Sequence, residues 1–336
     1  MKSQAGLFVV FCLLGSMRAF GQGPSEAGPA PRSETGMYVP DTIAPNIPGV
    51  VAGGTRVQLV KDDYTGPAMI SYEGPVPLPD GSILFAENLR NRIHKIDSGG
   101  NASLFLDNTN AALGMAFDPK GRLIAVETTP GKSRIAVIYP RGSETVLSDN
   151  FEGKPYGRPN DLVVDKKGGI YFTEPGPRAV PGSAPPPLPP AVYYIPPGGK
   201  SIRVVEGVTG PNGIQLSPDE KILYLNNASD SLLAFDVQAD GTLSNRRNFA
   251  KYHADPGVNI TPDGLAIDSE GRIYIATRMG VQVYSPKGEY LDTIPISRQP
   301  QNLAFGGPDK KTLYVVGFNA AWKIPMLAQG IKGRAK

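Results

Sequence analysis

Short apolar segments separated by polar turns recur along most of the chain. In each unit an apolar stretch leads into a turn rich in Pro, Asp or Gly, and a run of five or six apolar, β-branched or aromatic residues follows. This pattern predicts a β-hairpin. Six such units are present: LPDGSILFAE at 78–87, DPKGRLIAVE at 118–127, DKKGGIYFTE at 165–174, SPDEKILYLN at 217–226, DSEGRIYIAT at 268–277 and GPDKKTLYVV at 307–316.

The spacing of these units indicates a repeat architecture. The fourth residue of each turn serves as a common register position, and successive register positions are 40, 47, 52, 51 and 39 residues apart. A period of about 40–50 residues with a hairpin in every unit is typical of the four-stranded blades of a β-propeller. The register positions are Gly81, Gly121, Gly168, Glu220, Gly271 and Lys310.

Other architectures fit the pattern less well. A β-sandwich also has short strands, but it does not repeat one hairpin six times at nearly constant spacing. A helical solenoid needs apolar residues with a period of about 3.6, and no such stripe extends over ten residues after the N-terminal segment. We therefore predict an all-β, six-bladed propeller over 55–328. Its last blade lacks one strand, which we expect the strand-like segment 56–60 to supply.

The N-terminal residues 1–21 have the pattern of a secretory signal peptide. Lys2 precedes the apolar run 5–14, and the small residues Ala19 and Gly21 lie at a plausible cleavage point. The run is shorter than the ~20 residues that a membrane-spanning helix needs. We therefore expect a secreted or periplasmic protein that is not membrane-bound after cleavage. The single cysteine, Cys12, lies within this run, so no disulfide is expected.

Three further segments lie outside the repeats. Residues 22–54 are rich in Gly, Pro and Ala and predict a flexible leader. Residues 329–336 form a basic tail. Blade three carries a Pro-rich insertion at 175–191, which we expect to be stiff and extended and to narrow the channel mouth as a lid.

Composition and charge exclude several classes of function. The net charge of +3 with 19% charged residues gives no reason to expect a nucleic-acid partner. Two histidines and one cysteine leave no basis for a Cys/His zinc site. The histidines, His94 and His253, occupy different positions in the repeat, so we interpret both as structural. Motifs of nucleophile elbows, phosphate loops and helical zinc proteases are absent from the sequence.

One polar position per blade is predicted to face the central channel. It lies eight residues before the register position, where the innermost strand begins. Carboxylate and amide oxygens at this position would suit Ca²⁺, which takes about 6–8 oxygen ligands. The six positions are Glu73, Leu113, Asn160, Asn212, Asp263 and Asn302.

Two interpretations of this ring are open. Asn and Asp before Gly often form turns by bonding their own backbone. Buried carboxylates at an axis, however, carry a large desolvation cost unless a cation compensates it. We therefore predict a metal-binding channel that holds Ca²⁺, where Mg²⁺, Mn²⁺ or Zn²⁺ could take its place.

A second acidic set lies six residues after the register position. Glu87, Glu127 and Glu174 end the second strand of their blades, on the same face as the ring. We predict an acidic rim that binds a hydroxylated substrate or a second, weaker ion. The alternative is that these are solvated loop carboxylates.

The motifs around the ring resemble the regucalcin/gluconolactonase family, which includes luciferin-regenerating enzymes. The resemblance covers about 70–325 and implies a six-bladed calcium-binding propeller that often acts as a lactonase on sugar or other small lactones. It implies Glu73, Asn212 and Asp263 as metal ligands, with Asn160 at or near the metal and Arg158 in contact with substrate. The motifs are Glu73-Gly74-Pro75, Arg158-Pro159-Asn160-Asp161, Pro211-Asn212-Gly213 and Pro262-Asp263-Gly264-Leu265.

The predicted function is a calcium-dependent hydrolase that opens the ester of a small, sugar-type lactone. The metal would polarise the carbonyl and stabilise the oxyanion. Asp263 is the candidate general base, Asn160 would orient substrate or water, and Arg158 would bind a hydroxyl or carboxylate. We expect a monomer or dimer whose partner is a small-molecule lactone.

Two alternatives to a lactonase stay open. The first is a non-catalytic propeller that binds a ligand or a partner on one face and uses calcium structurally. The second keeps the scaffold and changes the reaction, to phosphotriester hydrolysis or to a strictosidine-synthase-like condensation.

Overall fold

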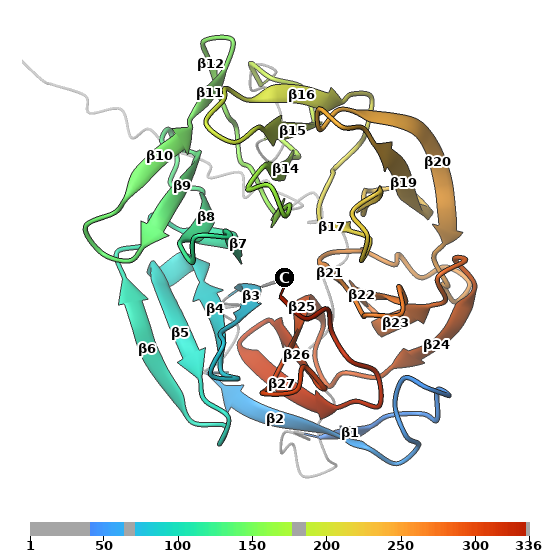
Figure 1. Ribbon diagram of the computed structural model, residues 1–336. Coiled ribbons are helices and arrows are strands. Elements are labelled where there is room, and N and C mark those ends of the chain that lie inside the picture. Colours follow the sequence, from blue (N-terminus) through green and yellow to red (C-terminus); the bar gives the residue numbers. More distant parts are fainter. Residues whose placement is uncertain (1–40, 64–70, 177–185, 334–336) are drawn as a thin grey trace, which may run out of the picture.

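A computed structural model describes residues 41–63, 71–176 and 186–333. Six sheets surround a central axis (Figure 1), and within the described residues the helical content is one 3₁₀ turn, η1 (Asn88–Arg90). The predicted all-β, six-bladed propeller is therefore confirmed. No helix in this part of the chain is long and apolar enough to cross a membrane.

Blades one to five are four-stranded sheets in which each strand pairs with the next one in sequence. A separate hairpin, β11 (Asn150–Phe151) and β12 (Lys154–Pro155), links blades two and three. The strands are β3 (Tyr72–Pro77), β4 (Ile83–Glu87), β5 (Arg92–Ile96) and β6 (Ala102–Asp107) in blade one; β7 (Ala112–Phe117), β8 (Leu123–Glu127), β9 (Arg134–Tyr139) and β10 (Thr145–Ser148) in blade two; β13 (Leu162–Val164), β14 (Ile170–Glu174), β15 (Ala191–Ile195) and β16 (Ile202–Val205) in blade three; β17 (Ile214–Leu216), β18 (Ile222–Leu225), β19 (Ser231–Val237) and β20 (Leu243–Lys251) in blade four; and β21 (Leu265–Ile267), β22 (Ile273–Thr277), β23 (Gly280–Tyr284) and β24 (Tyr290–Ile294) in blade five.

Blade six joins the two ends of the chain. Its C-terminal strands are β25 (Pro300–Gly306), β26 (Thr312–Gly317) and β27 (Ala320–Pro325). Strand β2 (Arg56–Asp62) pairs antiparallel with β27, and β1 (Thr42–Ile43) extends the sheet beyond it. The N-terminal strand thus closes the ring, as predicted.

The hydrophobic core lies between the blades. Each apolar cluster combines side chains of two neighbouring blades: Tyr274 with Trp322 across blades five and six, and Phe85 with Tyr314 across blades one and six. Both faces of a blade are therefore buried, which explains the continuous apolar runs in its strands. A blade cannot cover its own faces, so the ring must close for any one blade to be stable.

Two segments predicted to flank the propeller are packed against it. In the expected leader, residues 41–54 bury Ile47, Val50 and Val51 in the apolar cluster of blades five and six. In the expected tail, Gly330 forms a β-bridge with Asp268. The packed part of the chain thus extends beyond the propeller predicted at 55–328, and composition does not show that these few apolar residues find a buried surface. Residues 22–40 and the predicted signal peptide lie outside the described residues.

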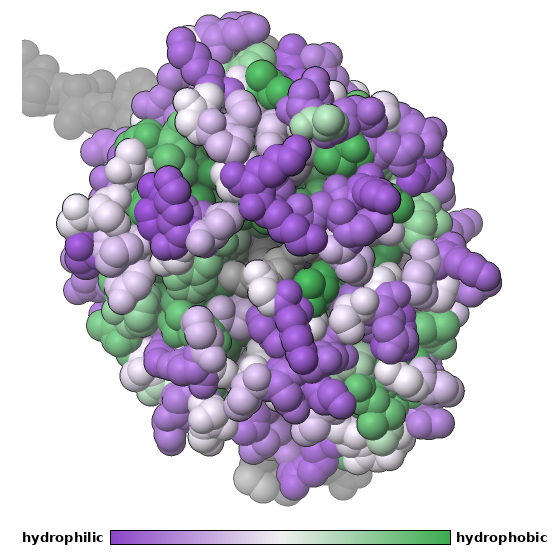
Figure 2. All heavy atoms as spheres, viewed as in Figure 1, coloured by the Kyte–Doolittle hydropathy of each residue, from purple (hydrophilic) through white to green (hydrophobic). Residues whose placement is uncertain are grey.

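The segment of the predicted Pro-rich insertion begins after β14 and ends where β15 begins. Leu188, near its end, is buried between blades two and three. Residues 177–185 lie outside the described residues, so the lid stays a prediction. On the face drawn in Figure 2, a hollow near the centre is bordered by both hydrophilic and hydrophobic side chains.

Candidate functional site

The innermost strands contact one another around the axis. A glycine follows the ring position in four blades, and backbone or side-chain atoms of the neighbouring blade fill the space that a side chain would need. A Cβ at Gly213 would lie 2.3 Å from the carbonyl oxygen of Asp263, and the Gly213 N–H donates to that oxygen at 3.2 Å. Gly114 N–H donates likewise to the Asn160 carbonyl at 3.1 Å. Backbone contacts therefore fix ring positions of adjacent blades relative to each other.

Glu73 is held by two amides of blade six. It lies in β3 and is 7% exposed. Gln301 Nε2 donates to Glu73 Oε1 at 3.2 Å, and Asn302 Nδ2 donates to Glu73 Oε2 at 3.4 Å. The sixth ring position, Asn302, thus supports the first one.

Asp263 lies just before β21, among other carboxylates. Burial raises its pKa well above the usual range, and the negative charges of Glu73 and Asp161 raise it further. A hydrogen bond from the Asn212 side chain and the positive charge of Arg158 act in the opposite direction. The channel mouth therefore brings acidic groups together in a poorly hydrated place.

The side-chain amide oxygen of Asn212 faces no hydrogen-bond donor of the described residues. Its Oδ1 is buried and has no hydrogen-bond partner among the described residues. Leaving a buried acceptor unsatisfied costs about 1–3 kcal/mol. Next to two carboxylates, such an oxygen is the kind of group that a bound cation satisfies.

The backbone leading to Asp263 is strained. Thr261 has φ +45°, a region that β-branched residues rarely adopt and that the following Pro262 disfavours further. The carbonyl of Ile260 accepts the N–H of Arg278 at 2.9 Å, which ties this segment to blade five. Strain of this kind persists where the surrounding structure holds a functional group in place.

Asn160 and Arg158 come from the segment before β13 and are both half-buried. The backbone of Asn160 is bonded on both sides, because its N–H donates to the Thr173 carbonyl at 2.9 Å and its carbonyl accepts from Gly114. The backbone N–H of Arg158 donates to Glu174 at 3.0 Å. The charge of Arg158 acts on Asp263, so the structure brings blade three and blade five together at the channel mouth.

Sequence reasoning missed two polar groups of this site. Asp161 is 1% exposed and its Oδ1 accepts the Leu162 N–H at 2.9 Å. Its position follows the ring position, where four other blades have Gly, and this departure could have identified it. Gln301 precedes the ring position of blade six, and only the structure shows that it reaches Glu73.

The second acidic set is placed differently from the prediction. Glu87, Glu127 and Glu174 are 0–2% exposed, so they do not form an open acidic rim. Their oxygens meet protein donors because the ends of the second strands face neighbouring strands rather than solvent. That any of them binds substrate stays a prediction. The donors are Arg90 and His94 for Glu87, Asn110 and Arg134 for Glu127, and the N–H groups of Gly157, Arg158 and Gly176 for Glu174.

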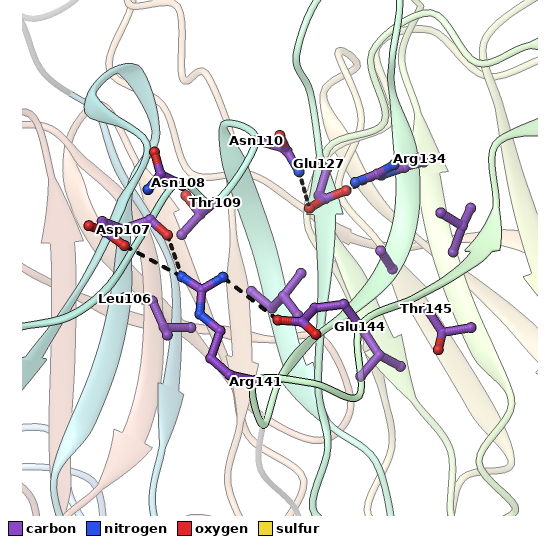
Figure 3. Close-up of a pocket in the computed structure, with 14 residues that line it drawn as sticks. Leu106, Asp107, Asn108, Thr109, Asn110, Glu127, Arg134, Arg141, Glu144 and Thr145 are labelled. Carbon is purple, nitrogen blue, oxygen red and sulfur yellow. Dashed lines mark hydrogen bonds and ion pairs between the residues drawn. The ribbon is translucent and has the colours of Figure 1, made fainter.

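One cavity of about 160 Å³ lies between blades one and two, away from the ring positions. In Figure 3, Arg141 lies between Asp107 and Glu144, while Asn110 and Arg134 both point toward Glu127. Its charged groups are paired with one another. The chemistry of the channel mouth is therefore separate from this cavity.

The metal-ligating atoms that the ring can offer are side-chain oxygens, with no sulfur or imidazole nitrogen. The described residues contain no group of three or more His, Cys, Asp or Glu side chains arranged to hold a metal ion. The ring instead combines the carboxylates of Glu73 and Asp263 with the amides of Asn160 and Asn212. Such a donor set favours hard cations over soft ones.

Residues 72–319 match the family model described as SMP-30/Gluconolactonase/LRE-like region. The chain belongs to this family. The match covers blades one to five and strands β25 and β26 of blade six, and it confirms the resemblance seen in the motifs around the ring.

Individual relatives agree with this assignment. The chain is 27% identical over 299 residues to a gluconolactonase of Zymomonas mobilis, covering 81% of this chain and 82% of the relative. It is 27% identical over 251 residues to the pentonolactonase XacC of Haloferax volcanii, covering 72% and 80%. Among solved structures, a gluconolactonase of Xanthomonas campestris superimposes with a TM-score of 0.72 at 28% identity, covering 89% of this chain and 98% of that one.

Proposed function

We propose that this protein is a metal-dependent lactonase that opens the ester of a small, sugar-type lactone. Relatives of similar length are named gluconolactonase, pentonolactonase and 6-deoxy-6-sulfogluconolactonase, which supports a hydroxylated lactone as substrate. The observation that carries the proposal is the charged cluster of Glu73 and Asp263 at the channel mouth beside the unpaired oxygen of Asn212.

The residues present fit a divalent cation. Like charges that repel each other and an unsatisfied amide oxygen are both compensated by a positive ion. Glu73, Asn160, Asn212 and Asp263 would hold it. Ca²⁺ suits these oxygen donors, and Mg²⁺, Mn²⁺ and Zn²⁺ are the further candidates. When bound, the ion supplies Lewis-acid polarisation of the lactone carbonyl.

The side chains around the ring account for the remaining steps. A carboxylate oxygen of Asp263 accepts a proton from the water that attacks the carbonyl carbon, and returns it to the ring oxygen of the lactone as the C–O bond of the ester breaks. The amide of Asn160 orients the lactone or the water. The guanidinium of Arg158 binds a hydroxyl or carboxylate of the substrate, since its planar fork matches such groups in two-point contacts. The strained segment at Thr261 holds Asp263 in place while the proton moves.

Hydrolysis of a lactone panel by pH-stat tests the proposal. The protein is first treated with chelator and then supplied with Ca²⁺. We expect acid release only after the metal is restored, and faster with sugar lactones than with unsubstituted ones. No release with any divalent metal, from a protein that still binds one, contradicts the proposal and favours a non-catalytic binding propeller.

We also propose that the protein acts outside the cytoplasm, as a secreted or periplasmic enzyme. The support is the charged start, the apolar run and the small residues within 1–21. Intact-mass analysis of the exported protein tests it. The expected mass lacks about 21 N-terminal residues, and an uncleaved chain confined to the cytoplasm contradicts it.

A further inference from the structure

Gln301 is bonded at both ends of its side chain to the beginning of blade one. This residue lies in β25 and is 8% exposed. Its Nε2 donates to Glu73 Oε1 at 3.2 Å, and its Oε1 accepts a hydrogen bond from Ser71 Oγ at 3.1 Å. With donor and acceptor both engaged, the amide has one orientation that satisfies its partners. It therefore holds the residues on either side of Tyr72, at the start of β3.

The main chain of Gln301 is bonded to blade five. Its carbonyl accepts the N–H of Gly264 at 2.8 Å, and Gly264 directly follows Asp263. No side chain fits at Gly264, because a Cβ there would lie 2.3 Å from the amide carbon of Asn302. Strands β21 and β25 are thus held in close contact beside Asp263.

One residue of blade six therefore connects the two carboxylates of the ring. Its side chain holds Glu73, and its carbonyl holds the residue next to Asp263. Asn302 also reaches Glu73, but at 3.4 Å, and its Oδ1 is engaged by the N–H of Leu303 at 2.9 Å. Gln301 makes the shorter contact and is the residue bonded to both sides.

We propose that Gln301 is a positioning residue that sets the spacing of the Glu73 and Asp263 carboxylates and thereby the affinity of the channel mouth for a divalent cation. The inference rests on the proposed function, because it assumes a cation at this ring. Two carboxylates repel each other, and a cation between them is bound most tightly when their oxygens are held near its preferred ligand distances. Partners that orient ligands in this way change metal affinity by about 10–100-fold when removed.

The test compares calcium affinity of full-length variants by isothermal titration calorimetry. Gln301→Met keeps the length of the side chain and removes both hydrogen bonds. We expect its Kd for Ca²⁺ to rise by about 10–100-fold. The matched control is Gln215→Met, because Gln215 is also a buried glutamine on an innermost strand, bonded to the backbone N–H of Leu216. Its Kd should stay within about twofold of the wild-type value.

Activity separates a positioning role from a structural one. If Gln301 acts through Glu73, the calcium concentration for half-maximal lactone hydrolysis rises by the same factor as the Kd. At saturating calcium, kcat then returns to the wild-type value. Ser71→Ala removes the hydroxyl that holds Gln301 and serves as a second variant should Gln301→Met fail to fold; about fivefold weaker calcium binding is expected from it.

The possible results discriminate between the two proposals. Equal calcium affinity in the wild type and Gln301→Met, or in the wild type and Ser71→Ala where Gln301→Met does not fold, overturns this inference and leaves the proposed function intact. A kcat that stays low at saturating calcium also overturns it. A wild-type protein that binds neither Ca²⁺ nor another divalent cation overturns both proposals.

Discussion

Two sets of carboxylates recur with the blades of this propeller, and their surroundings differ. Glu73 and Asp263 lie at the channel mouth, bonded to neutral amides and exposed to each other's charge. Glu87 and Glu127, at the ends of second strands, are bonded to arginine or histidine within their own blade. An acidic residue that recurs at the same position of several blades thus reflects the geometry of the repeat. It indicates a functional site where such acids lie close to one another, as Glu73 and Asp263 do.

The largest expected effect comes from Asp263→Asn, which should change activity and stability in opposite directions. We expect lactone hydrolysis to fall by at least about 10²-fold, because the variant lacks the base that accepts the proton from water. In chelator, however, the free energy of unfolding should rise, since a buried carboxyl beside the negative charges of Glu73 and Asp161 has been replaced by a neutral amide. A pH-stat and urea denaturation measure the two effects. Lactone hydrolysis at the wild-type rate, or a free energy of unfolding below that of the wild type in chelator, contradicts the proposed difference between the two sets of carboxylates.

Glu127→Gln should show the opposite pattern. Its carboxylate is bonded to Arg134 and Asn110, so the variant leaves a guanidinium without its counter-charge. The Arg134 side chain is 32% exposed, so solvent limits the effect. We expect the free energy of unfolding, measured by urea denaturation, to fall by about 1–2 kcal/mol, with kcat/KM within twofold of wild type. A fall in kcat/KM with unchanged stability would place Glu127 in the substrate site instead.

The smallest expected effect is a change in the pH dependence of stability in Glu174→Gln. Burial raises the pKa of Glu174 above its ordinary 4.5, against three main-chain N–H donors that lower it. The folded protein therefore keeps this proton to higher pH than the unfolded chain, so the contribution of the group to stability is complete below pH 4.5 and declines as pH rises through the raised pKa. The glutamine does not titrate.

The stability deficit of Glu174→Gln relative to wild type should consequently be largest near pH 4 and shrink toward pH 7. Each unit by which the pKa is raised corresponds to about 1.4 kcal/mol of this change. Urea denaturation at intervals from pH 4 to 7 gives the difference curve. A deficit that stays constant, or grows with pH, shows that the carboxyl is not desolvated as described.

Much of the fold follows from the sequence, because each blade repeats one hairpin and the hairpin has a local signature. The closing strand was also predictable, since the C-terminal blade lacks one strand and residues 56–60 resemble one. The packing of 41–54 was not. Ile47, Val50 and Val51 are sparse among Gly and Pro, and what buries them is a surface built from residues more than 200 positions away.

The candidate site was predictable to the extent that it follows the repeat. The ring positions could be counted from the turn, so Glu73, Asn160, Asn212 and Asp263 were found together. Contacts between blades obey no such period. The amide of Gln301 reaches Glu73 across 228 positions of sequence, and Glu174 is bonded to main-chain N–H groups before and after its strand. These hydrogen bonds become visible only in the folded structure.

The most direct test of the account is a crystal structure of the protein grown with Ca²⁺, with anomalous data collected at long wavelength. The account predicts a calcium peak at the channel mouth, with oxygens of Glu73, Asn212 and Asp263 about 2.3–2.6 Å from it. A channel mouth without such a peak, at a calcium concentration that saturates lactone hydrolysis, would contradict it.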